Sequence, residues 1–251
     1  MTQWKQRGLS VLLALTLLLG LSVSAFAAES DALSAAQEDT AKYLTQTVRK
    51  PQVGSIGGEW AVLGLSRSGY TVPEGYFRDY YAAVEDYVSA KQGVLHEKKY
   101  TEYSRLIVAL SSIGKDARNV AGYDLTVPLG DYDKTIWQGI NGPIWALIAL
   151  DSRNYPMPVN TAANTQATRQ MYVDRILDSQ RPDGGWSLKA NDAKTDPDLT
   201  GMALQALAKY RDQARVQQAV DAALEWMSAA QGADSGFSSW DTANSESCAQ
   251  M

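Results

Sequence analysis

The sequence predicts an all-α protein built from repeated pairs of helices. Segments rich in Ala and Leu recur along the chain and lack the alternating pattern of a β-strand. Longer and more polar segments with one apolar face lie between them. Pairs of one apolar and one polar helix, repeated at about 40 to 50 residues, form a helical solenoid or a closed ring of helices.

The apolar segments predict helices near residues 57–67, 101–113, 142–152 and 199–209. Their apolar residues are not confined to one face, so we expect these helices to be buried on most sides. Their alanines allow neighbouring helices to approach closely. They are therefore the expected inner helices, and two or more paired strands beyond residue 27 would overturn the prediction of a toroid.

The polar segments predict outer helices near residues 76–91, 165–180 and 214–230. In the last of these, Val220, Leu224 and Met227 share one face, whereas Gln217 and Asp221 lie elsewhere. This distribution is typical of an amphipathic helix at a surface.

A turn with glutamine, glycine and an aromatic residue follows two of the outer helices. Gln180 precedes Gly184 and Trp186, and Gln231 precedes a glycine and Phe237. Glycine permits a tight exit from a helix, and the glutamine side chain can bond the free backbone groups at the helix end. We expect the tryptophan to pack over the end of the next pair.

The first residues have the pattern of a secretory signal peptide. Lys5 and Arg7 precede an apolar run over residues 9–21, and small residues follow at Ala25 and Ala27. Cleavage near Ala27 would leave residues 28–251 as one domain, secreted or held at the cell surface. No later segment is long and apolar enough to predict a transmembrane helix.

Charge and composition exclude several classes of function. A net charge of −5 without a basic stripe argues against binding to nucleic acid. The single histidine, His96, and the single cysteine, Cys248, cannot build a Cys/His zinc site or an internal disulfide. His96 lies in a polar stretch and is expected to be a solvated loop residue. We expect no metal and no cofactor.

The turn between Ile176 and Trp186 resembles the QW repeat of squalene and oxidosqualene cyclases. That repeat has an aromatic, an aliphatic, three residues, Gln, three residues, Gly, one residue and Trp. Here Arg175 stands in place of the aromatic residue. A second copy, from Trp226 to Phe237, has one extra residue before its glycine and Phe in place of Trp.

From about Ala41 onward, the chain therefore resembles the squalene-cyclase and prenyltransferase superfamily. The resemblance implies an α/α-toroid, in which apolar helices form an inner ring around a central cavity. A full toroid has about six helix pairs. The sequence carries four pairs and the outer helix of a fifth, so we expect an incomplete ring and a truncated C-terminus. Val220, Leu224 and Met227 would then be poorly covered, and the first and last pairs would not touch.

An acidic segment before the fourth inner helix resembles the Asp-x-Asp-Asp-Thr-Ala motif of class II terpene cyclases. Asp196, Asp198 and Thr200 match the motif, whereas Leu199 replaces an aspartate and Gly201 replaces the alanine. The resemblance implies that Asp198 would protonate an alkene. The alternative is structural, because Asp198 can cap the helix by accepting a hydrogen bond from the amide of Thr200 or Gly201.

The same loop offers a third possibility, which is ion binding. Oxygen ligands for calcium are available from several side chains, although not at the spacing of an EF-hand. They are Asn191, Asp192, Asp196 and Asp198.

Aromatic residues near the starts of inner helices are the candidate ligand-binding residues. Trp60, Tyr103 and Trp145 have such positions, and Trp186 and Thr200 join them as candidates. Cyclases use such rings to stabilise carbocations by cation–π contact. Aromatic residues at helical spacing can instead form core, or a surface that binds sugars, peptides or corrinoids.

Two functions are consistent with these observations. The first is a non-catalytic binding module for a small apolar or corrinoid-like ligand, or for a cell-surface partner, since similar toroids bind ligand in secreted corrinoid carriers. The second is a class II terpene cyclase that uses Asp198. Export and the incomplete acidic motif favour the binding module, because polyprenyl substrates stay inside cells.

Overall fold

The computed structural model describes residues 31–189, 192–239 and 242–251. The expected signal peptide and its cleavage site near Ala27 lie outside these residues. Within them, helices dominate, which confirms the all-α prediction. Among the helices of these described ranges, none has the length and apolar character needed to cross a membrane.

The described elements follow one another along the chain in a simple order. They are a helix over residues 31–47, α2 (Ile56–Arg67), α3 (Tyr76–Ala90), α4 (Thr101–Ser112), η1 (Val127–Gly130), α5 (Tyr132–Thr135), η2 (Ile136–Gln138), α6 (Asn141–Asp151), α7 (Arg169–Leu177), α8 (Pro197–Leu207), η3 (Ala208–Tyr210), α9 (Ala214–Ala230), β1 (Ser238–Ser239), β2 (Thr242–Ala243) and α10 (Ser245–Gln250).

The four predicted apolar helices are confirmed as α2, α4, α6 and α8, and two of the three polar helices as α3 and α9. The third, α7, begins at Arg169 and is shorter than predicted. The reason is its cap, since the hydroxyl of Thr168 accepts a hydrogen bond from the amide of Met171 at 3.2 Å. The preceding residue Gln166 bridges to Asp131 instead of continuing a helix.

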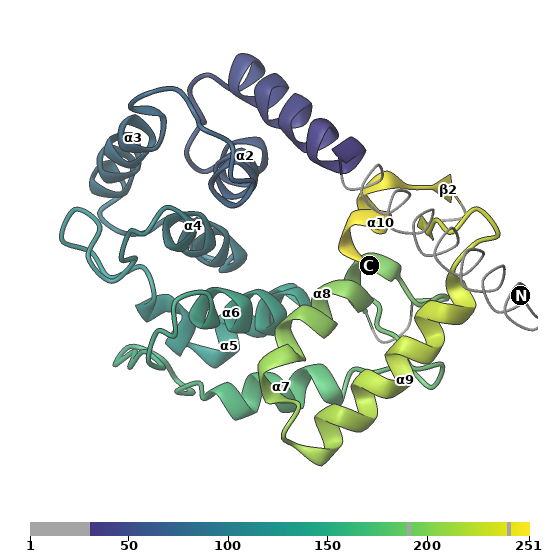
Figure 1. Cartoon of the computed structure of the whole chain (residues 1–251). Helices are drawn as coiled ribbons and strands as arrows, with labels where there is room; N and C mark the ends of the chain where they lie inside the picture. The colour runs from purple at the N-terminus through teal and green to yellow at the C-terminus, as the bar shows by residue number, and fades with distance from the viewer. Residues whose placement is uncertain (1–30, 190–191, 240–241) are drawn as a thin grey trace, which may run out of the picture.

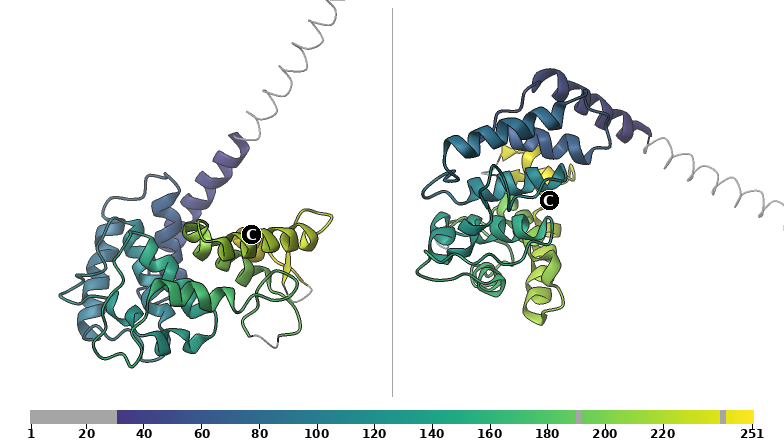
Figure 2. Two further views of the ribbon diagram at one scale, coloured as in Figure 1. Left: turned by 90° about the horizontal axis from the view of Figure 1, so that it is seen from below. Right: turned by 90° about the vertical axis from the view of Figure 1, so that its left-hand side faces the viewer.

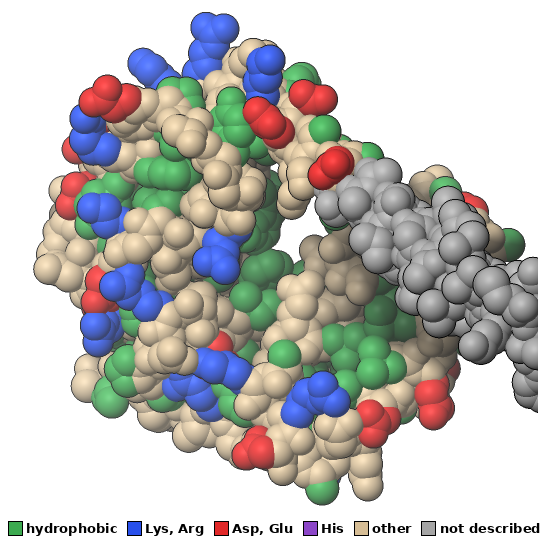
Figure 3. Space-filling model, in the orientation of Figure 1, with side chains coloured by type: hydrophobic (Ala, Val, Ile, Leu, Met, Phe, Trp, Pro, Cys, Tyr) green, Lys and Arg blue, Asp and Glu red, His purple; other side chains and the backbone are tan. Residues whose placement is uncertain are grey.

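The apolar helices α2, α4, α6 and α8 lie side by side in chain order, and α10 continues the row (Figure 1). The helices α3, α5, α7 and α9 lie on the outer side of this row. The helix over residues 31–47 lies at the edge of the fold (Figure 2). Figure 3 shows an opening near the middle of the molecule, with hydrophobic side chains along its walls.

The alternation of long helices is interrupted between α4 and α6. The short elements η1, α5 and η2 lie there in place of one long polar helix. This segment nevertheless holds α6 closely. A Cβ atom on Gly142 would lie 1.8 Å from the carbonyl oxygen of Thr135, so only glycine fits at this contact.

A short antiparallel ribbon departs from the purely helical prediction. Ser238 pairs with Ala243 and Ser239 pairs with Thr242. Each strand has only two residues, and the ribbon leads from α9 into α10. The helical class of the fold is unchanged, but two paired strands are the observation expected to argue against a toroid, so the all-α class is confirmed and the toroid is not.

The glutamine turns make the backbone contacts that their composition predicts. The side-chain amide of Gln180 donates, through Nε2, to the carbonyl oxygens of Gly184 at 2.6 Å and Ala219 at 2.7 Å. Gln231 donates to the carbonyl of Ser235, also four residues ahead, at 2.9 Å. The matching bonds show that the two turns repeat in structure as well as in sequence.

The predicted bare face of α9 is present only in part. Leu224 is 47% exposed, as expected, but Val220 is 4% exposed and belongs to the core. The expectation was wrong for Val220 because α7 and α8 both pack against α9. In Figure 1, α9 lies on the opposite side of the molecule from α2 and α3.

Candidate functional site

Each inner helix keeps a partly exposed stripe, although its other faces are buried. On α6 the stripe is Asn141, Trp145 and Ile148, at the i, i+4, i+7 spacing of one helical face. Neighbouring inner helices cover the flanks of α6 and outer elements cover its back, so this stripe faces the central opening. We use the name concave wall for the partly exposed residues on the corresponding stripes of α2, α6 and α8, which are Trp60, Leu63, Asn141, Trp145, Ile148, Asp198 and Met202.

Two of the predicted aromatic residues meet on the concave wall. The ring centroids of Trp60 and Trp145 are 5.3 Å apart, with an angle of 42° between the ring planes. They come from α2 and α6, which flank α4 on either side. The pair therefore spans α4 and supplies a partly exposed aromatic surface, on which an apolar or flat ligand can lie.

Two hydrogen-bond acceptors at the N-terminal ends of α6 and α8 have no donor. The oxygen Oδ1 of Asn141 and the oxygen Oδ1 of Asp198 are both buried, and neither accepts a hydrogen bond from the residues that the structure describes. They lie in the first turns of two helices in direct contact. Buried acceptors normally have a partner, so such a pair indicates a place for water or for a ligand with N–H or O–H groups.

The N-cap of α8 is Asp196, which corrects the expectation that Asp198 would cap the helix. Asp196 Oδ1 accepts a hydrogen bond from the amide of Leu199 at 3.0 Å. Pro197 explains the shift, because proline favours the first helical position and so places the cap one residue earlier. Asp198 lies in the first turn of α8, where its Oδ1 is buried without a hydrogen-bond donor among the described residues.

Trp186 and Thr200 lie in the core and bond to each other. The amide of Trp186 donates to Thr200 Oγ1 at 3.0 Å, and the Trp186 indole donates to the carbonyl of Ile176 at 2.8 Å. Both side chains are fully buried. Their contacts fix the glutamine turn against the start of α8, and the structure does not bring them to the concave wall.

Tyr103 lies apart from the two tryptophans. It is buried, and its hydroxyl accepts a hydrogen bond from the amide of Leu95 at 3.0 Å. Burial raises the pKa of this hydroxyl, an effect that the Leu95 amide partly offsets. Tyr103 lines a separate pocket at the N-terminal end of α4. The predicted ligand-binding residues therefore do not form one site.

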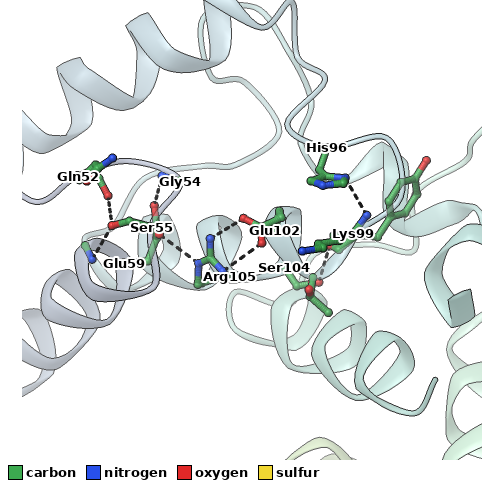
Figure 4. A network of polar contacts seen from close by, with 12 residues as sticks. Gln52, Gly54, Ser55, Glu59, His96, Lys99, Glu102, Ser104 and Arg105 are labelled. Carbon is green, nitrogen blue, oxygen red and sulfur yellow. Dashed lines mark hydrogen bonds and ion pairs between the residues drawn. The ribbon is translucent and has the colours of Figure 1, made fainter. Parts of the chain in front are cut away.

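A largely buried charged network, which was not predicted from the sequence, joins α2 to α4 (Figure 4). Arg105 Nε lies 3.1 Å from Glu59 Oε2, and the Arg105 guanidinium lies 2.5 Å from Glu102 Oε2. The other oxygen of Glu59 accepts a hydrogen bond from the amide of Gly54 at 2.7 Å. Burial raises the pKa of Glu59, although the Gly54 amide and Arg105 oppose that shift. The sequence signal for this network was the presence of opposite charges, Glu59 and Arg105, in two segments that are otherwise largely apolar.

The calcium alternative gains no geometric support. Within the described residues, no three acidic, histidine or cysteine side chains are grouped so that they could hold a metal ion. Asp192 accepts a hydrogen bond from the amide of Lys189 at 2.8 Å, and Asp196 caps α8. Asn191 lies outside the described residues.

Comparison of the chain with models of protein families, with curated proteins and with solved structures gave no match. The likeness to squalene cyclases and prenyltransferases therefore rests on the repeat and on the QW-like turns alone.

Proposed function

We propose that the chain is a non-catalytic ligand-binding module of the squalene-cyclase and prenyltransferase toroid type, exported by its N-terminal signal peptide. Its ligand would lie against the concave wall. One observation carries the proposal: Trp60 and Trp145 bring two partly exposed indoles together, and the first turns of α6 and α8 hold the donor-free, buried oxygens of Asn141 and Asp198.

This combination selects a ligand of mixed chemistry. The two oxygens can accept hydrogen bonds from amide or hydroxyl groups, and the two indoles can cover an apolar body. A corrinoid-like molecule has both features, since amide arms surround a flat macrocycle. A purely hydrocarbon ligand would leave both acceptors unpaired, which costs about 1–3 kcal/mol for each buried group.

A class II terpene cyclase is the second candidate. The burial of Asp198 Oδ1 favours it, because an acid that protonates an alkene must be shielded from water. Two features oppose it. Leu199 stands in place of the second aspartate of the motif, and the wall borders an opening rather than a closed cavity (Figure 3).

Calorimetric titration with cyanocobalamin tests the binding proposal. We expect binding by the native chain, a loss of affinity of at least about tenfold in Asp198→Leu, and a change below about threefold in Asp198→Asn, which keeps an acceptor oxygen. Asp212→Leu is the matched control, because Asp212 is exposed and lies outside the wall. An affinity that Asp198→Leu leaves unchanged would contradict the proposed site.

Incubation with squalene distinguishes the two candidates. The binding module should form no cyclic product that gas chromatography with mass spectrometry detects. A cyclised product that disappears in Asp198→Asn would establish the cyclase and overturn the proposal, since asparagine cannot donate the carboxyl proton.

A further inference from the structure

A second pocket lies at the N-terminal end of α4, away from the residues of the concave wall. It has a volume of about 770 Å³, within the range of about 300–1,000 Å³ that is typical of small-molecule sites. The loop before α4 forms one side and the segment from Tyr123 to Trp137 forms the other. We call it the α4-end pocket, and its lining includes the aromatic and charged side chains of His96, Lys98, Tyr103, Asp124, Asp133 and Trp137.

The aromatic part of the pocket has an accessible ring at its rim. Trp137 is 58% exposed, which is unusual for the largest apolar side chain. The ammonium group of Lys98 lies 5.9 Å from its ring centroid. Deeper in the pocket, the rings of Tyr100 and Tyr103 meet edge to face at 5.4 Å. The walls are therefore ordered by ring contacts, and the Trp137 indole remains open to a ligand.

The carboxylates of the pocket are held in place and keep a free oxygen. Asp124 Oδ1 accepts hydrogen bonds from the amide and hydroxyl of Thr126, at 2.8 and 2.6 Å. Asp133 Oδ2 accepts one from the hydroxyl of Thr165 at 2.9 Å. The second oxygen of each carboxylate accepts no hydrogen bond from the described part of the chain, so both are available to hydroxyl groups of a ligand.

His96 adds an oriented donor to the same pocket. Its Nδ1 accepts hydrogen bonds from the amides of Lys98 and Lys99, at 3.0 and 3.1 Å, and Figure 4 shows the contact with Lys99. Because Nδ1 is an acceptor, the proton of the neutral ring lies on Nε2. The ring is fixed by these two bonds and can donate through Nε2.

The charges of the lining nearly balance. Glu97, Asp124 and Asp133 face Lys98 and Lys134 within one pocket. Such a lining does not attract a strongly anionic or cationic ligand. It suits a neutral ligand with many hydroxyl groups.

We propose that the α4-end pocket binds a neutral oligosaccharide, independently of the ligand proposed for the concave wall. A sugar ring has one face of C–H groups, which stacks on an exposed indole, and a rim of hydroxyls, which bond to carboxylates and imidazole. Trp137 supplies the stacking face. Asp124, Asp133 and His96 supply the polar rim.

Titration with cellotriose, maltotriose and chitotriose tests this site, with calorimetry and tryptophan fluorescence as readouts. We expect at least one of the three to bind with a Kd of about 1 mM or lower, and Trp137→Ala to weaken that binding at least about tenfold. Asp133→Asn should weaken it by about threefold or more, since an amide has one acceptor oxygen in place of two. Trp137 is exposed, so its removal should leave thermal unfolding unchanged.

Tyr43→Ala is the matched control, because Tyr43 is 65% exposed and lies outside this pocket. Its sugar affinity should equal that of the native chain within about twofold. Absence of binding for all three sugars at about 10 mM would overturn the proposal. So would an affinity that Trp137→Ala leaves unchanged, or tighter binding of inorganic pyrophosphate than of any sugar. None of these outcomes bears on the cyanocobalamin titration.

Discussion

The inner helices α2 and α4 meet across a charged network, whereas α4 and α6 meet across aliphatic side chains. At the first interface, Arg105 lies between the carboxylates of Glu59 and Glu102. Helices α4 and α6, which contact each other, contribute fully buried aliphatic side chains to the main core, among them Leu110 and Leu147.

One row of helices therefore uses two kinds of contact. Apolar burial is strong but non-directional, so most of the contact between α4 and α6 fixes no particular pair of atoms. The hydrogen bond that Ser152, the C-cap of α6, donates to Ser111 Oγ at 2.9 Å is an exception. A buried ion pair adds little net stability, because its desolvation offsets its attraction, but it requires a defined geometry. The bond from Gly54 to Glu59 extends that geometry to the loop before α2.

Replacing Arg105 should have the largest effect at the charged interface. Arg105→Met leaves Glu59 buried without a cation, so we expect the free energy of unfolding to fall by about 3–5 kcal/mol. Urea denaturation at pH 7 measures this loss. Arg78→Met is the control, because its pair with Asp79 is exposed and should contribute about 0–1 kcal/mol. Equal losses in the two variants would show that the network is not what joins α2 to α4.

At the apolar interface, Leu147→Ala should cost about 2–5 kcal/mol, because it removes a fully buried side chain and leaves a cavity. The loss should be the same in low and high salt, since no charge is involved. Val159→Ala, at a residue that is 71% exposed, should stay within about 0.5 kcal/mol. A loss at Leu147 that depends strongly on salt would remove the contrast between the interfaces.

The starts of α8 and α4 also differ in the kind of contact that stabilises them, with a smaller expected effect on stability. Asp196 caps α8 locally, whereas the start of α4 is bonded by a distant residue, Gln138, whose Oε1 accepts from the amide of Thr101 at 3.2 Å. We expect Asp196→Ala to lower the free energy of unfolding by about 1 kcal/mol and Asp198→Ala by less than about 0.5 kcal/mol. Thermal denaturation distinguishes the two. A larger loss of unfolding free energy in Asp198→Ala than in Asp196→Ala would indicate that Asp198 is the cap.

The smallest effect should appear in the dependence of stability on pH. The pKa of Glu59 is raised in the folded state above its ordinary value of 4.5, chiefly by burial. The folded chain then binds this proton more tightly than the unfolded chain, so this residue's contribution to stability is greatest below pH 4.5 and falls as the pH rises through the raised pKa. Glu59→Gln should remove this component, measured as the change in unfolding free energy across that window. An identical pH profile in native chain and variant would contradict it.

The helical class and the positions of most long helices could be predicted from the sequence. Apolar spacing in segments such as the one ending in Leu110 is a local property, and local spacing decides which residues form a helix and which faces are buried. The glutamine turn at Gln180 could also be predicted, because one of its hydrogen bonds reaches only four residues ahead, to Gly184. Its second bond, to Ala219 in the next outer helix, depends on packing. The position of Pro197 alone was enough to assign Asp196 as the cap, because proline favours the first helical position. The prediction that Asp198 is the cap overlooked this local signal.

Which side chains meet depends on the packed fold. Trp60 and Trp145 contact each other across α4, Glu59 pairs with Arg105 from the next inner helix, and Tyr103 belongs to a different pocket. These contacts join residues far apart in the chain. They depend on how the connecting segments fold and how the helices rotate against one another, and residue spacing within one helix does not contain that information. The same reason explains why the donor-free oxygens of Asn141 and Asp198 emerged only from the packed structure: an acceptor is unpaired because of what surrounds it, not because of its place in the sequence.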